Sequence, residues 1–252
     1  MRTTDSVDRV VSVLELLAET PDGLGVSEVA DALGVHKTTG SRLLGTLAAR
    51  GLLERDPVTR RYWLGTGIVG LAGAAIARLR VVSQARPELE RLSALTSETV
   101  NLAILNGRHV VYVDQVTPRQ AVVMANWVGR RSPAHASSSG KVLLAFGDEL
   151  VRRAVLSHRL EQLTPRTVTD KARLGAILAS ARRQGYVRSS GELEEGLVTI
   201  AAPVLVHGRA VAAVSVSGPS FRIPARDQPH LAHLAIDAAT AVGRRIGGEV
   251  TP

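Results

Sequence analysis

The segment Ser138-Ser139-Gly140-Lys141 places a serine three residues before a lysine, a spacing found in catalytic Ser-Lys pairs. The S-x-x-K pattern occurs in acyl-enzymes, where the serine attacks an ester or an amide. Those enzymes also need S-D-N and K-T-G elements, and neither tripeptide occurs in the chain. A Ser-Lys acyl-transfer hydrolase is therefore one hypothesis, but the remaining sequence does not support it.

The same serines could instead bind an anion. A helix predicted over 137–147 begins at them, and the first N–H groups of a helix, with its dipole, favour a carboxylate. Ser215 and Ser217 are two residues apart on a predicted strand, so their hydroxyls share one face. A pocket for a small organic acid is the second hypothesis.

Metal and thiol chemistry find little support. The chain has no cysteine, which excludes a thiol catalyst, an iron–sulfur cluster and a Cys-ligated zinc site. His230 and His233 are spaced wrongly for an H-E-x-x-H zinc motif, and only Asp227 and Asp237 lie nearby. We expect a solvated or capping histidine pair, with no metal site and no cofactor.

Basic residues gather in one stretch. Residues 36–61 carry six basic side chains against two acidic ones, whereas residues 1–35 carry two against seven. A basic stretch beside an acidic one indicates a face that binds a polyanion. Only 3% of the residues are aromatic, which argues against single-strand binding through rows of stacked bases.

Hydrophobic periodicity predicts the elements that position this basic stretch. Helices are expected at 5–19, from an N-cap at Ser27 to Leu33, and at 37–50. Short strands follow at 52–55 and 61–64, around a turn at 56–60. Three helices and a hairpin predict a winged helix-turn-helix.

The rest of the chain predicts an α+β domain with a mixed sheet. A length of 252 residues favours two domains, here 1–65 and 84–252, joined by a linker helix at 66–83. The expected strands are 100–105, 109–115, 121–127, 186–189, 198–206 and 210–217, and the expected helices are 66–82, 83–96, 137–147, 148–157, 170–184 and 226–246.

Several sequence blocks carry a family resemblance over nearly the full length. They are Ser27-Glu28-Val29-Ala30, Thr38 to Leu47, Tyr62-Trp63-Leu64-Gly65, His135 to Lys141, Gly185-Tyr186, Gly196 to Val204 and Ser215 to Pro219. In this order the chain resembles an IclR-family transcriptional regulator. The resemblance implies a GAF-like effector domain, dimers formed through the N-terminal region, and often tetramers formed through the C-terminal domains.

The helix predicted at 37–50 would be the recognition helix. Its N-terminal side chains face the major groove, and Arg42 can bind guanine O6 and N7 together unless it merely caps or pairs with a neighbouring acid. Gly40 either permits close approach to DNA or is simply tolerated. The candidate DNA-binding residues are Lys37, Thr38, Thr39, Ser41, Arg42, and Arg60 and Arg61 in the wing.

The resemblance implies an effector pocket at Ser138, Ser139, Ser189, Leu197, Thr199, Ser215 and Ser217. Ser189 stands where an acidic residue is common in the family, and Thr199 stands where a cysteine often occurs. We therefore expect a pocket more positive than the family norm, which takes a mono- or dicarboxylate.

These observations together predict a one-component repressor. The expected partners are double-stranded operator DNA and a small carboxylate, and the expected assembly is a homodimer or tetramer. The N-terminus lacks an apolar signal core and no apolar run is long enough for a membrane span, so we expect a cytoplasmic protein. The hydrolase and an effector-independent DNA-binding protein are the alternatives.

Overall fold

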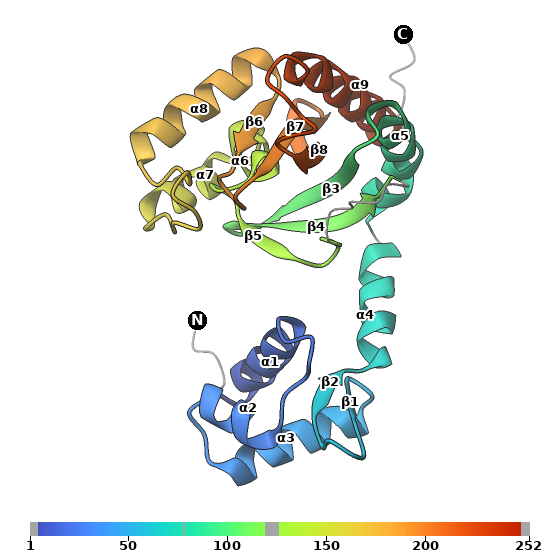
Figure 1. Ribbon diagram of the computed structural model, residues 1–252, viewed down its shortest axis with the longest axis vertical. Coiled ribbons are helices and arrows are strands. Elements are labelled where there is room, and N and C mark those ends of the chain that lie inside the picture. Colours follow the sequence, from blue (N-terminus) through green and yellow to red (C-terminus); the bar gives the residue numbers. More distant parts are fainter. Residues whose placement is uncertain (1–4, 78, 119–125, 248–252) are drawn as a thin grey trace. The chain divides into compact units, whose positions relative to one another are not determined.

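A computed structural model describes residues 5–77, 79–118 and 126–247 (Figure 1). The chain forms two compact units, Met1–Arg78 and Leu79–Pro252. Among the described residues, no single helix is both long enough and apolar enough to cross a membrane.

The N-terminal unit is a winged helix-turn-helix, as the sequence predicts. Its small core is formed by Val13, Leu17, Val29, Leu44, Leu47, Leu53 and Tyr62, which come from all three helices and both strands of the hairpin. The elements are α1 (Asp5–Ala18), α2 (Val26–Ala32), α3 (Lys37–Ala49), β1 (Leu53–Arg55), β2 (Tyr62–Leu64) and α4 (Thr66–Ala77).

Gly25 and Gly40 determine where α2 begins and how closely α3 packs on it. Helix α2 begins at Val26 with Gly25 as its N-cap, so Ser27 lies inside the helix and the predicted cap is wrong. The N–H of Gly25 donates to the Glu28 carboxylate at 2.6 Å, which anchors this start. Gly40 is buried, and a Cβ there would lie 3.2 Å from Ala30 Cβ, so its small size lets α3 pack closely on α2.

The C-terminal unit is built on a six-stranded sheet in the order β5-β4-β3-β8-β7-β6. Every pairing between these strands is antiparallel, where a mixed sheet was expected. Tight turns at Gly107 and Gly208 account for two of these pairings, β3 with β4 and β7 with β8. The strands are β3 (Thr99–Asn106), β4 (His109–Val116), β5 (Arg131–Pro133), β6 (Val187–Ser190), β7 (Leu197–Val206) and β8 (Arg209–Pro219).

Helices cover both faces of this sheet. On one face, α5 (Arg80–Thr96) and α9 (Gln228–Gly247) pack against a cluster that includes Val100 and Leu102 (Figure 1). On the other face, α6 (Ser138–Phe146), α7 (Glu149–Ser157) and α8 (Lys171–Gln184) pack against Ala103 and its neighbours. Since residues alternate between the two faces of a strand, Asn101 and Ala103 point toward the face covered by α6. With helices on an antiparallel sheet, the fold class is α+β.

Most boundaries lie within two residues of the expected ones, but three differ more. The helix expected at 66–82 ends at Ala77. The strand expected at 121–127 falls largely outside the described residues; Asn126 and Trp127 are not in a strand, and Arg131–Pro133 pairs with β4 instead. Helix α5, expected at 83–96, starts at Arg80. Its first residues Val81 and Val82 pack against the apolar cluster between the sheet and helices α5 and α9.

Candidate functional site: an exposed basic helix and a hydroxyl-lined pocket

Helix α3 presents polar side chains at its N-terminal end. His36 is the N-cap, and its Nδ1 accepts the N–H of Thr38 at 3.4 Å and lies 2.9 Å from the Thr38 hydroxyl oxygen. Lys37 and Ser41 are exposed, whereas Thr39 is half-buried. The Thr38 hydroxyl therefore has a local partner, and Lys37 and Ser41 are open to a ligand.

Arg42 is exposed one turn further along α3. Its guanidinium has no ion pair or hydrogen bond within the part of the chain that the structure describes. The interpretation in which Arg42 pairs with a neighbouring acid therefore finds no partner in the described ranges. An unpaired planar guanidinium on this helix can take both acceptors of a guanine edge.

The wing between β1 and β2 is held by Asp56. Its carboxylate accepts the N–H groups of Val58 and Thr59 at 2.7 and 2.6 Å, and these bonds hold the pKa of Asp56 below its ordinary value. Arg60 follows with φ near 60° and an exposed side chain. The turn therefore fixes the backbone while Arg60 remains at the surface.

Arg61 differs from Arg60. Its guanidinium donates to the carbonyl of Gly23 at 2.8 Å and pairs with Glu28 at 3.1 Å. The N–H of Gly25 and the guanidinium of Arg61 hold the pKa of Glu28 below its usual value. Arg61 therefore links the wing to the turn before α2.

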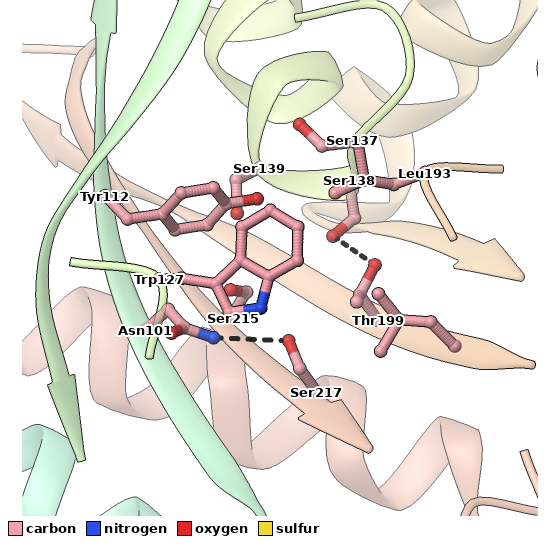
Figure 2. A pocket seen from close by; sticks show the side chains of 11 residues that line it. Asn101, Tyr112, Trp127, Ser137, Ser138, Ser139, Leu193, Thr199, Ser215 and Ser217 are labelled. Atoms are coloured by element: carbon pink, nitrogen blue, oxygen red, sulfur yellow. Dashed lines mark hydrogen bonds between the residues drawn. The ribbon is translucent and has the colours of Figure 1, made fainter. Parts of the chain in front are cut away.

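A pocket lies in the C-terminal unit between the sheet and the start of α6 (Figure 2). Its empty space is about 350 Å³, a figure that includes space open to solvent. Its lining contains no charged side chain among the described residues, and consists of Asn101, Tyr112, Trp127, Ser137, Ser138, Ser139, Leu193, Leu197, Thr199, Ser215 and Ser217.

The start of α6 supplies backbone donors to this pocket. The Ser137 hydroxyl caps the helix by accepting the N–H of Gly140 at 3.0 Å. The N–H groups of Ser138 and Ser139 have no partner in the described ranges, as expected for the first turn of a helix. Two free donors and the positive end of the helix dipole suit a carboxylate.

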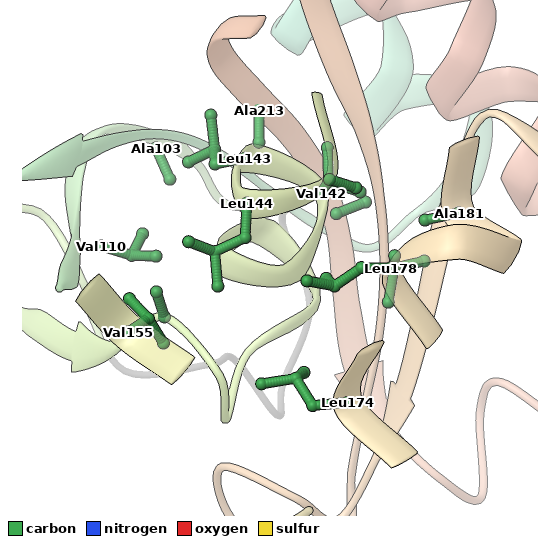
Figure 3. Packing of buried hydrophobic residues seen from close by; sticks show 14 of the residues in the cluster. Ala103, Val110, Val142, Leu143, Leu144, Val155, Leu174, Leu178, Ala181 and Ala213 are labelled. Carbon is green, nitrogen blue, oxygen red and sulfur yellow. The ribbon is translucent and has the colours of Figure 1, made fainter. Parts of the chain in front are cut away.

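Packing fixes the position of α6. Its apolar side chains Val142, Leu143 and Leu144 are buried among residues from the sheet, α7 and α8 (Figure 3). Gly140 lies directly against the backbone of Ala134, so no Cβ fits there. The helix start therefore cannot shift easily relative to the sheet, which keeps its donors in place.

Six of the seven effector residues expected from the sequence line this pocket: Ser138, Ser139, Leu197, Thr199, Ser215 and Ser217. The Ser138 hydroxyl donates to the Thr199 hydroxyl oxygen at 2.8 Å. Ser189 does not line the pocket. Its hydroxyl donates to Glu192 Oε1 at 3.0 Å, so a carboxylate lies beside the serine that the resemblance places at a commonly acidic position.

Lys141 is completely buried. Its Nζ donates to Glu192 Oε2 at 2.6 Å, while the Ser138 hydroxyl is directed to Thr199. Burial lowers the pKa of Lys141, and the adjacent Glu192 opposes that change. The Ser138–Lys141 pair of an acyl-enzyme is therefore not assembled, because each side chain is hydrogen-bonded to a different partner.

Family models match both units of the chain. The model described as the IclR helix-turn-helix domain matches residues 6–57, and the one described as bacterial transcriptional regulator IclR C-terminal matches residues 73–244. The chain belongs to the IclR family. This IclR-family chain is a DNA-binding transcriptional regulator.

Relatives of this IclR-family regulator match it over nearly its full length. It is 37% identical to the transcriptional regulator BhcR of Paracoccus denitrificans, covering 93% of this chain and 84% of BhcR. It is 32% identical to the transcriptional repressor AllR of Escherichia coli, covering 98% and 92%. It is similar in structure to an IclR homologue of Microbacterium hydrocarbonoxydans complexed with 4-hydroxybenzoate, with 31% identity, a TM-score of 0.82 and coverage of 96% and 98%.

Four lining residues of this IclR-family chain were not predicted from the sequence: Asn101, Tyr112, Trp127 and Leu193. Ser137 also lines the pocket, at the start of the helix expected over 137–147. The rings of Tyr112 and Trp127 meet edge to face with centroids 5.3 Å apart, and burial raises the pKa of Tyr112. The N–H of Trp127 donates to Gln115 Oε1 at 2.8 Å, which helps to hold this wall. The sequence offered one signal for a pocket residue here, because Asn101 is the only polar residue in the otherwise apolar strand expected at 100–105.

Proposed function

We propose that this regulator is a homodimeric repressor whose DNA affinity is changed by a small carboxylate. AllR, which is named a repressor, is similar over nearly the full chain. Operator DNA is the expected partner, which implies a cytoplasmic protein. The proposed functional division is a DNA-binding domain at 1–65, a linker at 66–83 that contains α4 and the start of α5, and an effector domain at 84–252.

The DNA contacts are assigned from exposure and hydrogen bonding. Arg42 and Ser41 read base edges, while Lys37 and Arg60 bind phosphates, because all four are exposed cations or hydroxyls on α3 or the wing. Thr38 and Thr39, at the same N-terminal end of α3, add further contacts to the DNA. Arg61 supports the wing through Gly23 and Glu28.

The observation that carries the effector proposal is the start of α6. Ser138 and Ser139, whose N–H groups have no partner among the described residues, line a cavity together with the hydroxyl-bearing Thr199, Ser215 and Ser217. A carboxylate there would accept several charge-assisted hydrogen bonds. The relative solved with 4-hydroxybenzoate binds an acid of this kind.

The lining favours one negative charge rather than two. Among the described residues it holds no cationic side chain, because nearby Lys141 is paired with Glu192. A second carboxylate would lose its water without gaining a charged partner. We therefore propose a monocarboxylate.

The test uses the full chain and DNA from its own promoter. Footprinting should show a protected palindrome, and a panel of monocarboxylates should change the affinity for that fragment measured by fluorescence anisotropy. Such a change requires the acid to bind two conformations with different affinity, because equal binding shifts nothing. Equal binding to all DNA sequences, with no effect of any acid, would support an effector-independent DNA-binding protein.

The hydrolase alternative is tested with the same preparation. Hydrolysis of an activated ester that disappears on Ser138→Ala would establish it. We expect no Ser138-dependent turnover, because the Ser138 hydroxyl donates to Thr199 rather than facing a lysine base.

A further inference from the structure

Asn101 on β3 is a buried amide whose hydrogen bonding the fold completes only in part. Its side chain is 3% exposed and lines the pocket. The Nδ2 atom donates to the Ser217 hydroxyl oxygen at 3.3 Å, a long hydrogen bond. The Oδ1 atom has no hydrogen-bond partner within the described residues.

An unpartnered buried acceptor destabilises a fold, and most such atoms in proteins have partners. The next residue on the same face of β3 is Ala103, which packs in the apolar cluster beneath α6. Packing alone would therefore be served by an apolar residue at position 101. The amide is explained if its partner comes from outside the fold.

The arrangement of the pocket suggests what that partner is. Figure 2 shows Ser137, Ser138 and Ser139 on one side of the Trp127 ring, and Asn101 and Ser217 on the other. Leu193 and Leu197 add apolar surface. The pocket thus has free N–H donors at α6, an apolar middle and a free acceptor at β3.

We propose that Asn101 selects an effector that carries a hydrogen-bond donor in addition to its carboxylate. The inference rests on the proposed carboxylate site and adds a second point of recognition. The ligand class is a small monocarboxylic acid with a hydroxyl or amino group on an apolar body. The carboxylate accepts from the N–H groups of Ser138 and Ser139, and the hydroxyl or amino group donates to Asn101 Oδ1.

The experiment compares matched acids that differ by one hydroxyl. Calorimetry on the full chain would use benzoate against its three hydroxy isomers, and propionate against lactate. At least one hydroxy acid should bind the parent about tenfold or more tightly than its matched acid, since a site built around a hydroxyl rejects analogues that lack it. Asn101→Leu should reduce that preference to less than about threefold, because the Oδ1 acceptor is removed. The same change also removes the Nδ2 donor to Ser217, which all the acids experience alike.

Thermal unfolding without ligand separates this role from a structural one. Asn101→Leu should unfold at the same or a higher temperature, because the unpartnered acceptor is gone. Asn101→Asp keeps an acceptor at the same place but adds a negative charge, which should weaken the binding of every acid. Its readout is therefore the ratio between a hydroxylated acid and its matched acid, and this preference should be retained. A markedly lower unfolding temperature for Asn101→Leu, with the hydroxyl preference intact, would show that Asn101 serves the fold.

The remaining outcomes separate the inference from the function beneath it. If acids bind but no hydroxyl improves binding in the parent, the role of Asn101 is overturned while the carboxylate site stands. If no acid of either kind binds, although the protein still protects its operator, the carboxylate site is overturned and this inference falls with it.

Discussion

The proposed DNA-binding surface and the proposed effector pocket offer opposite chemistry. On α3 and the wing, Lys37, Arg42 and Arg60 are exposed cations. In the pocket, the described lining is uncharged and its serine hydroxyls belong to buried residues. The first surface is suited to attraction that falls steeply with salt, whereas the second depends on short hydrogen bonds in a region of low dielectric.

In or near each region, one cation is already in an ion pair within the fold. Arg61 pairs with Glu28 at 3.1 Å, and Lys141 pairs with Glu192 at 2.6 Å. Both cations belong to motifs that suggested chemistry in the sequence, one in the wing and one in the S-x-x-K pattern. A cation that is already paired within the fold is less available to bind a ligand than one that is exposed and unpaired among the described residues.

The largest effect is expected for Lys141→Met. Removing one partner of a buried ion pair leaves the other charge uncompensated, and we expect a loss of about 3–5 kcal/mol in the free energy of unfolding. Lys171→Met on the exposed start of α8 is the control and should change that free energy by less than about 0.5 kcal/mol. Urea unfolding followed by circular dichroism measures both. Equal stability of the two variants would mean that the buried pair contributes nothing.

Gly140→Ala should come next. The new methyl group meets the backbone of Ala134, so α6 must move, and we expect a loss of about 2–3 kcal/mol together with weaker acid binding. Gly175→Ala in α8 meets nothing within 4 Å and should gain up to about 1 kcal/mol from helix propensity. The same unfolding measurement tests this pair. A stabilised Gly140→Ala variant would contradict the close contact at α6.

Arg42→Ala should weaken operator binding by about 1–3 kcal/mol and hardly change binding to random DNA, because a base contact is lost. Arg50→Ala removes the same charge at the other end of α3, where Arg50 is the C-cap. It should affect both DNAs alike. Anisotropy titrations on the two DNAs separate these cases, and equal loss on both for Arg42→Ala would assign Arg42 to phosphate.

The elements of this fold were largely predictable because their signals are local. Helix α3 and the hairpin follow from the Leu44 and Leu47 spacing and from the turn residues around Asp56. The start of α2 was misplaced because Gly25 gains its cap from the Glu28 carboxylate rather than from its own side chain. The break before Arg80 depends on packing against α9, which sequence periodicity does not reveal.

The candidate site was predictable only where strand alternation or a family motif determines it. Ser215 and Ser217 share a face by the two-residue period of β8, and both line the pocket. Tyr112 and Trp127 could not be assigned, because their meeting depends on Gln115, which holds Trp127. Glu28 and Glu192 lie 33 and 51 residues from the cations they bind, so no local pattern reveals these pairs.

The smallest expected effects separate the two neighbouring wing arginines. Arg60→Ala should reduce the slope of log affinity against log salt by about 0.9 if its exposed side chain neutralises one phosphate. Arg61→Ala should leave that slope nearly unchanged, because the guanidinium already binds Gly23 and Glu28. It should instead cost at most about 1 kcal/mol of stability, as expected for a partly exposed ion pair. Anisotropy across a salt series, with unfolding curves for both variants, measures the contrast. A slope that changes for Arg61→Ala and not for Arg60→Ala would reverse the assignment, since it would mean that Arg61 leaves Glu28 when DNA binds.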